Sequence, residues 1–223
     1  MTNQPYAIAR PAESLLATNK LVRNTYLLLS MTLLFSAATA GIAIATNMPF
    51  MGPLVTLGGY FGLLFLTAHL RNSAWGLLSV FALTGFMGLT LGPMINAYLQ
   101  YYANGGQLVM LAMGGTGAIF LGLSGYALTT RKDFSFLGGY VFVGILVAFL
   151  AGIGAVIFGL PALSLAVSAV FIMLMSAYIL FQTSAMIHGE ETNYIMATIS
   201  LYVSIYNLFT SLLHLLGAFA GED

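Results

Sequence analysis

Long uncharged runs of apolar residues alternate with short polar segments along the whole chain. A transmembrane helix needs about 20 mostly apolar residues to cross the hydrocarbon core of a bilayer. The uncharged runs predict seven such spans, at 24–46, 54–70, 74–91, 108–129, 136–158, 163–187 and 194–220. The third span can continue to Tyr102, with a kink at Gly92-Pro93, because 92–102 is also uncharged. The pattern predicts an all-α integral membrane protein with seven transmembrane helices in one bundle.

The composition agrees with this fold class. Of the 223 residues, 60% are hydrophobic and 5% are charged, whereas about a quarter of the residues of a soluble domain are charged. The chain has no cysteine, which excludes disulfides, thiolate nucleophiles and cysteine-ligated metals. The formal net charge is zero and no basic run occurs, so nucleic acid is not an expected partner. The lipid bilayer is the expected surrounding.

Short polar segments, 1–23 and 221–223, flank the predicted transmembrane domain 24–220. The apolar run after Arg23 is long enough to span a bilayer, so we interpret it as an uncleaved first helix rather than a signal peptide. Residues 1–23 are polar and interrupted by prolines, which predicts a tail that does not fold. Fully extended, its roughly 20 residues would reach about 65 Å.

All the basic residues fall on one side of the seven predicted spans. These six are Arg10, Lys20, Arg23, Arg71, Arg131 and Lys132. The loops on the opposite side, 47–53, 92–107 and 159–162, contain no lysine or arginine. Because cytoplasmic loops carry an excess of Lys and Arg, we predict a cytoplasmic N-terminus and a periplasmic C-terminus.

The loop after the sixth span holds a histidine close to two adjacent acids, His188, Glu190 and Glu191. A metal site needs several ligands that converge in fixed geometry, and the sequence offers no second cluster to complete one. We therefore interpret this cytoplasmic loop as a polar connection. Asn193 or Thr192 is available to cap the next helix, with the acids near its N-terminus. No metal or cofactor is predicted.

The seventh span carries a single stripe of small and polar residues, here called the polar seam. Its members are Asn193, Ala197, Ser200, Ser204, Asn207, Ser211, His214, Ala218 and Gly221. Their spacing, alternately four and three, predicts one helical face that points into the bundle. The seam is either packing contact between helices or the wall of a hydrated cavity that carries ions or protons. The lack of a carboxylate favours packing, and Gln182 is the best candidate to meet the seam from the sixth span.

Two short motifs also match those of rhomboid intramembrane proteases. "GLSG" at 122–125 resembles their serine motif, and "HLLGAFAG" at 214–221 resembles their histidine motif. Catalysis requires Ser124 and His214 to meet at about 3 Å. Counting along the two helices separates them by about 20 Å in depth, so we predict no catalytic residue.

Three longer stretches resemble the Bax inhibitor-1 family of seven-helix membrane proteins. They are "GFMGLTLGP" with Ala112 and Thr116 following, "TTRKDFSFLGG" at 129–139, and "FQTSAMIHGEETNYIMATISLYVSIYNLF" at 181–209. The resemblance spans nearly the whole chain. It implies seven helices, as counted above.

The resemblance also implies a function. Residues 23–37 and "HGEETNYI" look most like a bacterial inner-membrane member that binds the ATP-dependent protease FtsH with its partners HflK–HflC. That member is a slow substrate and so restrains the protease. Other members, proposed as pH-gated calcium leaks, carry acidic residues where this chain has Gln182 and Ser204. Glutamine and serine cannot share a proton as two carboxylates do, so the resemblance does not extend to that gate. An ion or proton channel lined by the seam is the alternative hypothesis.

Overall fold

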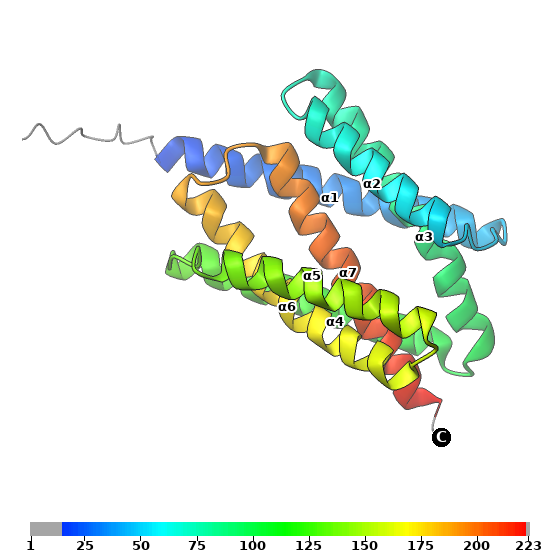
Figure 1. Ribbon diagram of the computed structural model, residues 1–223. Helices are drawn as coiled ribbons and strands as arrows, with labels where there is room; N and C mark the ends of the chain where they lie inside the picture. Colours follow the sequence, from blue (N-terminus) through cyan, green and yellow to red (C-terminus); the bar gives the residue numbers. More distant parts are fainter. Residues whose placement is uncertain (1–14, 222–223) are drawn as a thin grey trace, which may run out of the picture.

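The computed structural model describes residues 15–221, which form seven α-helices and no strand (Figure 1). The helices are α1 Leu15–Ala45, α2 Pro53–Leu70, α3 Ala74–Tyr101, α4 Gly105–Thr130, α5 Leu137–Ile157, α6 Pro161–His188 and α7 Tyr194–Ala220. All seven are long and apolar enough to cross a membrane. The predicted all-α membrane architecture with seven spanning helices is confirmed.

Some helix ends differ from those that the uncharged runs predict. α1 begins at Leu15, so the last part of the predicted polar tail is helical. The runs stop at Lys20 and Arg23, yet lysine and arginine are good helix formers, and both side chains are exposed here. By contrast, α3 continues through Pro93 to Tyr101, which agrees with the longer third span that the uncharged residues 92–102 allow. Arg10 lies outside the described residues, as do 222–223.

α7 is the central helix of the bundle. In Figure 1 it lies between α1–α3 on one side and α4–α6 on the other. It packs against α1, α3, α4 and α6, whereas α2 packs mainly on α3 and α5 mainly on α6. Its largest fully buried side chains include Leu201, Leu208 and Leu213. The apolar side chains of α2 and α5 are largely exposed, as expected for helices that face lipid.

α1 and α3 approach each other closely at two glycines of α3. A Cβ atom at Gly88 would collide with the carbonyl oxygen of Ser36 and the hydroxyl of Thr39, and one at Gly92 would collide with Ala43. In a membrane, helices associate through van der Waals packing and hydrogen bonds, so small residues at the contact bring backbones together. The α1–α3 contact therefore depends on the missing side chains of Gly88 and Gly92.

We expect Gly88→Ala to lower the free energy of unfolding by about 1–3 kcal/mol, the usual cost of overpacking a close contact. One of the obstacles, the Ser36 carbonyl oxygen, is backbone, which cannot rotate away as a side chain would. Thermal unfolding in detergent measures the effect. Gly122→Ala on α4 is the matched control, because a Cβ there meets nothing within 4 Å and alanine favours a helix. Equal stability of the two variants would contradict the close contact.

Candidate functional site

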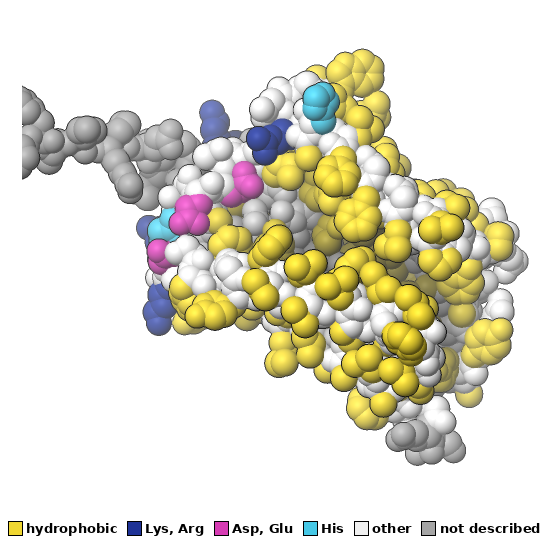
Figure 2. Space-filling model, viewed as in Figure 1, with side chains coloured by type: hydrophobic (Ala, Val, Ile, Leu, Met, Phe, Trp, Pro, Cys, Tyr) yellow, Lys and Arg dark blue, Asp and Glu magenta, His cyan; other side chains and the backbone are white. Residues whose placement is uncertain are grey.

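The charged side chains gather at one end of the molecule, at the left of Figure 2. The α2–α3, α4–α5 and α6–α7 loops lie at this end, together with the first described turns of α1 (Figure 1). It contains five of the six predicted orientation charges, Lys20, Arg23, Arg71, Arg131 and Lys132, and all five are exposed. We call this region the charged end.

Asn193 ties two of these loops together. Its side-chain oxygen accepts hydrogen bonds from the backbone N–H groups of Ile195 (3.0 Å) and Met196 (3.1 Å), and so caps α7. Its side-chain nitrogen donates to the carbonyl oxygen of Arg71 (3.0 Å) and to the Asn72 side chain (2.9 Å). One side chain thus begins the central helix and fastens the α2–α3 loop to it.

The predicted loop residues His188, Glu190 and Glu191 lie around this capped start of α7. A carboxylate oxygen of Glu191 accepts the backbone N–H of Asn193 at 2.7 Å, and Nδ1 of His188 lies 2.9 Å from the carbonyl oxygen of Ser184. Glu190 is exposed. Within 15–221, no three His, Cys, Asp or Glu side chains group closely enough to hold a metal ion. The contacts are those of a capped helix start.

Ser184, which the sequence did not single out, holds the third loop of the charged end. Its hydroxyl accepts the backbone N–H of Phe134 at 2.9 Å and lies 3.3 Å from the carbonyl oxygen of Lys132. In the same loop, the backbone N–H of Ser135 donates to Asp133 at 2.8 Å. This bond holds the pKa of the Asp133 carboxyl below its usual range. Side chains therefore fix all three loops: Asn193 of the α6–α7 loop holds the α2–α3 loop, and Ser184 of α6 holds the α4–α5 loop.

The residues of the polar seam do not share one set of partners. Ser204 is fully buried and donates to the carbonyl oxygen of Ser200 at 2.8 Å, and Asn207 donates to that of Val203 at 2.8 Å, both within α7. Ser211 is also buried. Within residues 15–221, His214 is the one seam residue that reaches another helix through a hydrogen bond, with Nδ1 lying 2.8 Å from the Ser168 hydroxyl of α6.

The predicted meeting of Gln182 with the seam has no hydrogen bond to support it. Gln182 is buried, and its side-chain nitrogen has no hydrogen-bond partner among the described residues. The hydroxyl of Ser124 is also buried and has no hydrogen-bond partner among the described residues. Since His214 pairs with Ser168, the serine and histidine of the protease-like motifs do not form a pair.

A second polar face of α7, which the sequence analysis missed, bonds the central helix to α1 and α3. The hydroxyl of Tyr202 donates to the carbonyl oxygen of Thr84 at 3.2 Å. It also lies 2.6 Å from the hydroxyl of Ser36. Tyr202 and Ser36 are both buried. One phenol thus joins three helices in the interior of the bundle.

The same face continues one turn away on either side. Thr198 Oγ1 lies 3.3 Å from the carbonyl oxygen of Thr25 on α1, and the Tyr206 hydroxyl lies 3.1 Å from that of Thr90 on α3. We call Thr198, Tyr202 and Tyr206 the hydroxyl ladder. Their spacing of four residues was a readable signal. It was missed because tyrosine was grouped with the apolar residues.

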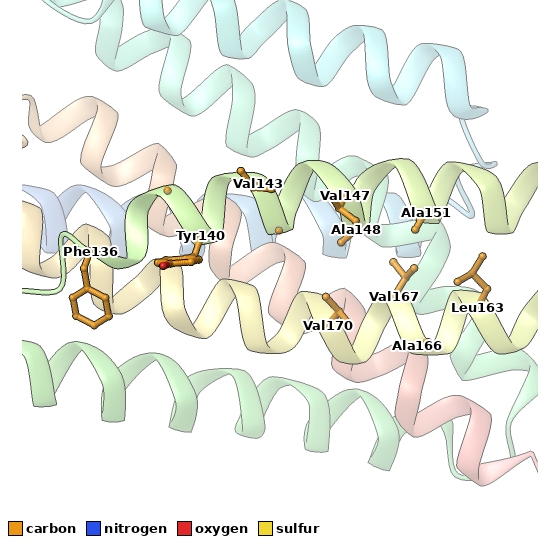
Figure 3. Close-up of a pocket in the computed structure, with 12 residues that line it drawn as sticks. Phe136, Tyr140, Val143, Val147, Ala148, Ala151, Leu163, Ala166, Val167 and Val170 are labelled. Carbon is orange, nitrogen blue, oxygen red and sulfur yellow. The ribbon is translucent and has the colours of Figure 1, made fainter.

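Two cavities flank α7, one on each side of the ladder. The α1–α4 cavity, of 530 Å³, has Tyr202 and Tyr206 in its lining. The α2–α5 cavity, of 590 Å³, is lined in part by Ser204, Asn207 and again Tyr206. A third hollow of 890 Å³ lies along α5 and α6 (Figure 3), where almost every lining side chain is apolar. Of the seam, Ser204 and Asn207 therefore do line a cavity.

Comparison with known proteins identifies the family. A family model described as inhibitor of apoptosis-promoting Bax1 matches residues 18–221. The chain belongs to the Bax inhibitor-1 family. It is 52% identical over 210 residues, 94% of each chain, to a protein of Escherichia coli K12 named modulator of FtsH protease YccA. It is 50% identical over 223 residues, 100% of each chain, to an uncharacterized protein of Pseudomonas aeruginosa. An uncharacterized membrane protein of Vibrio cholerae is 43% identical over 212 residues, 95% of each chain.

Membership of the Bax inhibitor-1 family confirms the resemblance that the sequence motifs indicated. In another Escherichia coli strain the relative is named inner membrane protein YccA. With seven membrane-spanning helices, this chain is a multi-pass protein of the bacterial inner membrane. The match covers almost all the described residues, so the hydroxyl ladder, the cavities and the charged end all lie within the family's common region.

We expect Asn193→Ala to lower the free energy of unfolding by about 0.5–2 kcal/mol, because α7 loses its cap and the α2–α3 loop loses its anchor. Thermal unfolding measures the loss. Thr192→Ala is the control, since Thr192 is exposed and its side chain makes no hydrogen bond to the described residues. If both variants unfold alike, Asn193 does not hold the charged end together.

Proposed function

We propose that this chain modulates the ATP-dependent membrane protease FtsH, as a slow substrate and inhibitor that acts with HflK–HflC. The observation that carries the proposal is the 52% identity to a protein named for that modulation, over 94% of both chains. The HflK–HflC part rests on the resemblance of the sequence motifs alone. Neither the family description nor the relative's name describes a catalytic activity.

The proposal places the charged end in the cytoplasm and the C-terminus in the periplasm. Its support is the charge distribution: Arg10 precedes α1, Lys20 and Arg23 lie in its first turns, and the other basic residues occupy loops at the same end of the molecule. Such an excess of basic residues is typical of the cytoplasmic side. An ATP-driven protease that works from the cytoplasm would then meet the polar N-terminal segment first.

The N-terminal segment offers a starting point for extraction. Residues 1–14 precede α1, and fully extended they would span at most about 50 Å. A force applied to this segment acts first on α1. This helix is held by Gly88 and Gly92 of α3 and by the Tyr202–Ser36 hydrogen bond. Contacts of this kind, each worth about 1 kcal/mol in a membrane, must break together before α1 can leave. That resistance would make the chain a slow substrate.

We expect deletion of 2–14 to lengthen the half-life of the chain in cells that contain FtsH by at least about tenfold, because the protease loses its starting point. Pulse-chase labelling measures the half-life. The control replaces 2–14 by a flexible glycine–serine segment of equal length, which gives the protease a segment to engage but lacks the native sequence. Loss of FtsH on pull-down with the deletion, but not with the control, would assign the contact to the tail.

An unchanged half-life after the deletion would contradict extraction from the N-terminus. A stoichiometric FtsH complex that survives the deletion would place the contact in the helices instead. No FtsH in a mild-detergent pull-down of the unaltered chain would overturn the proposal.

A second candidate function, an ion or proton pathway beside α7, has one observation in its favour. Ser204 and Asn207 line the 590 Å³ cavity near the middle of the bundle. We expect Asn207→Leu to abolish proton or calcium flux in liposomes if this pathway conducts, because it removes a polar side chain from the lining. FtsH binding should be unchanged. Flux equal to that of the unaltered chain would remove the seam as a pathway.

A further inference from the structure

The α2–α5 cavity combines an apolar body with unpaired hydrogen-bonding groups. Tyr60 of α2 and Tyr178 of α6 both line it, and neither phenol hydroxyl makes a hydrogen bond to any residue within 15–221. By contrast, the hydroxyls of Tyr26, Tyr202 and Tyr206 all have partners. An unpaired hydroxyl in an apolar setting is costly, so a cavity that retains two of them is suited to a ligand that accepts hydrogen bonds.

The lining defines the charge of that ligand. Among the described residues, the polar members of the lining are neutral hydroxyls and one amide, and no charged side chain takes part. Asn207 uses its amide nitrogen once, toward Val203, and an amide nitrogen carries two hydrogens. The second hydrogen remains available. Neutral donors without a counter-charge fit an uncharged carbonyl rather than a phosphate or an ion.

The depth of the two phenols excludes the carbonyl of an ordinary phospholipid. Tyr60 and Tyr178 each lie about 15 Å along their helices from the ends at Leu70 and His188. The hydrocarbon core is about 30 Å thick, so both hydroxyls lie near its middle. The ester carbonyls of a phospholipid stay with its charged headgroup at the interface. A carbonyl that reaches this depth belongs to a molecule with no charged headgroup.

The shape and the opening of the cavity point to a flat ring with an apolar tail. Aromatic side chains supply much of the lining, namely Phe61, Phe86, Phe142, Phe149 and Phe171, and aromatic rings stack on or meet edge-to-face with another ring. α2 and α5 both line the cavity, yet they pack on α3 and α6 rather than on each other. We therefore infer that the cavity opens sideways between α2 and α5, toward lipid, where a tail can lie.

We propose that the α2–α5 cavity binds an uncharged, lipid-soluble molecule of the quinone class. Tyr60 and Tyr178 donate hydrogen bonds to its carbonyl oxygens, the aromatic side chains contact its ring, and its tail leaves between α2 and α5. The volume of 590 Å³ is in the range of small-molecule sites, about 300–1,000 Å³. This site goes beyond the proposed protease modulation and does not depend on it.

The test is saturable binding of decylubiquinone to the full chain in phospholipid nanodiscs, with the uptake of empty nanodiscs subtracted. We expect saturation near one quinone per chain. The double variant Tyr60→Phe with Tyr178→Phe should weaken the affinity at least about tenfold, because two hydrogen bonds are lost. Tyr140→Phe is the matched control: this phenol is 79% exposed and lies on the α5–α6 hollow instead. It should leave the affinity unchanged.

Two further measurements keep the outcome clear if the double variant folds poorly. A photoreactive azidoquinone should crosslink to α2 or α6 peptides of the unaltered chain, and unlabelled decylubiquinone should suppress that crosslink. Decylbenzene, which has a ring and tail but no carbonyl, should not compete. Uptake no greater than that of empty nanodiscs, equal competition by decylbenzene, or equal affinity of the double variant and Tyr140→Phe would each overturn the proposal.

Discussion

The hydrogen bonds of Tyr202 determine how the rest of the bundle is arranged. A buried hydroxyl within a bilayer has no water to pair with, so the Tyr202 hydroxyl must find its partners in the protein. It finds them in the Ser36 hydroxyl and the Thr84 carbonyl oxygen. These partners belong to α1 and α3, which are themselves brought together at Gly88. The pairing of this phenol thus holds α7 against α1 and α3, with Thr198 and Tyr206 of the hydroxyl ladder on either side.

The other half of the molecule meets α7 through a different set of contacts. There α4 and α6 pack along α7, and among the described helices the one hydrogen bond from the seam to another helix is that of His214 with Ser168. The cavities lie where neighbouring outer helices do not meet. Tyr206 lines both the α1–α4 and the α2–α5 cavity while its hydroxyl lies 3.1 Å from that of Thr90. Tyr206 therefore lies between the two cavities.

The sequence was sufficient for the number of helices, because each apolar run is long enough to span and is bounded by polar residues. It was also sufficient for the family, since the motifs at 85–93, 129–139 and 181–209 keep their order and spacing. It misplaced the start of α1, where charged residues continue a helix beyond the apolar run. From the sequence, only the seam was expected to face the interior of the bundle, because tyrosine was counted among the apolar residues of the span. The hydroxyl ladder was therefore missed. Which hydroxyl pairs with which carbonyl depends on how the helices pack, and the sequence of one helix does not contain that information.

The proposed modulation of a membrane protease that works from the cytoplasm requires the charged end to face the cytoplasm, and single-cysteine labelling tests this most directly. The chain has no cysteine of its own, so Glu190→Cys in the α6–α7 loop and Ala103→Cys between α3 and α4 each introduce a single thiol. Both positions are exposed. A membrane-impermeant maleimide added to spheroplasts should label the Ala103→Cys variant at once and the Glu190→Cys variant only after the membrane is opened. The reverse pattern would place the charged end in the periplasm and contradict the account.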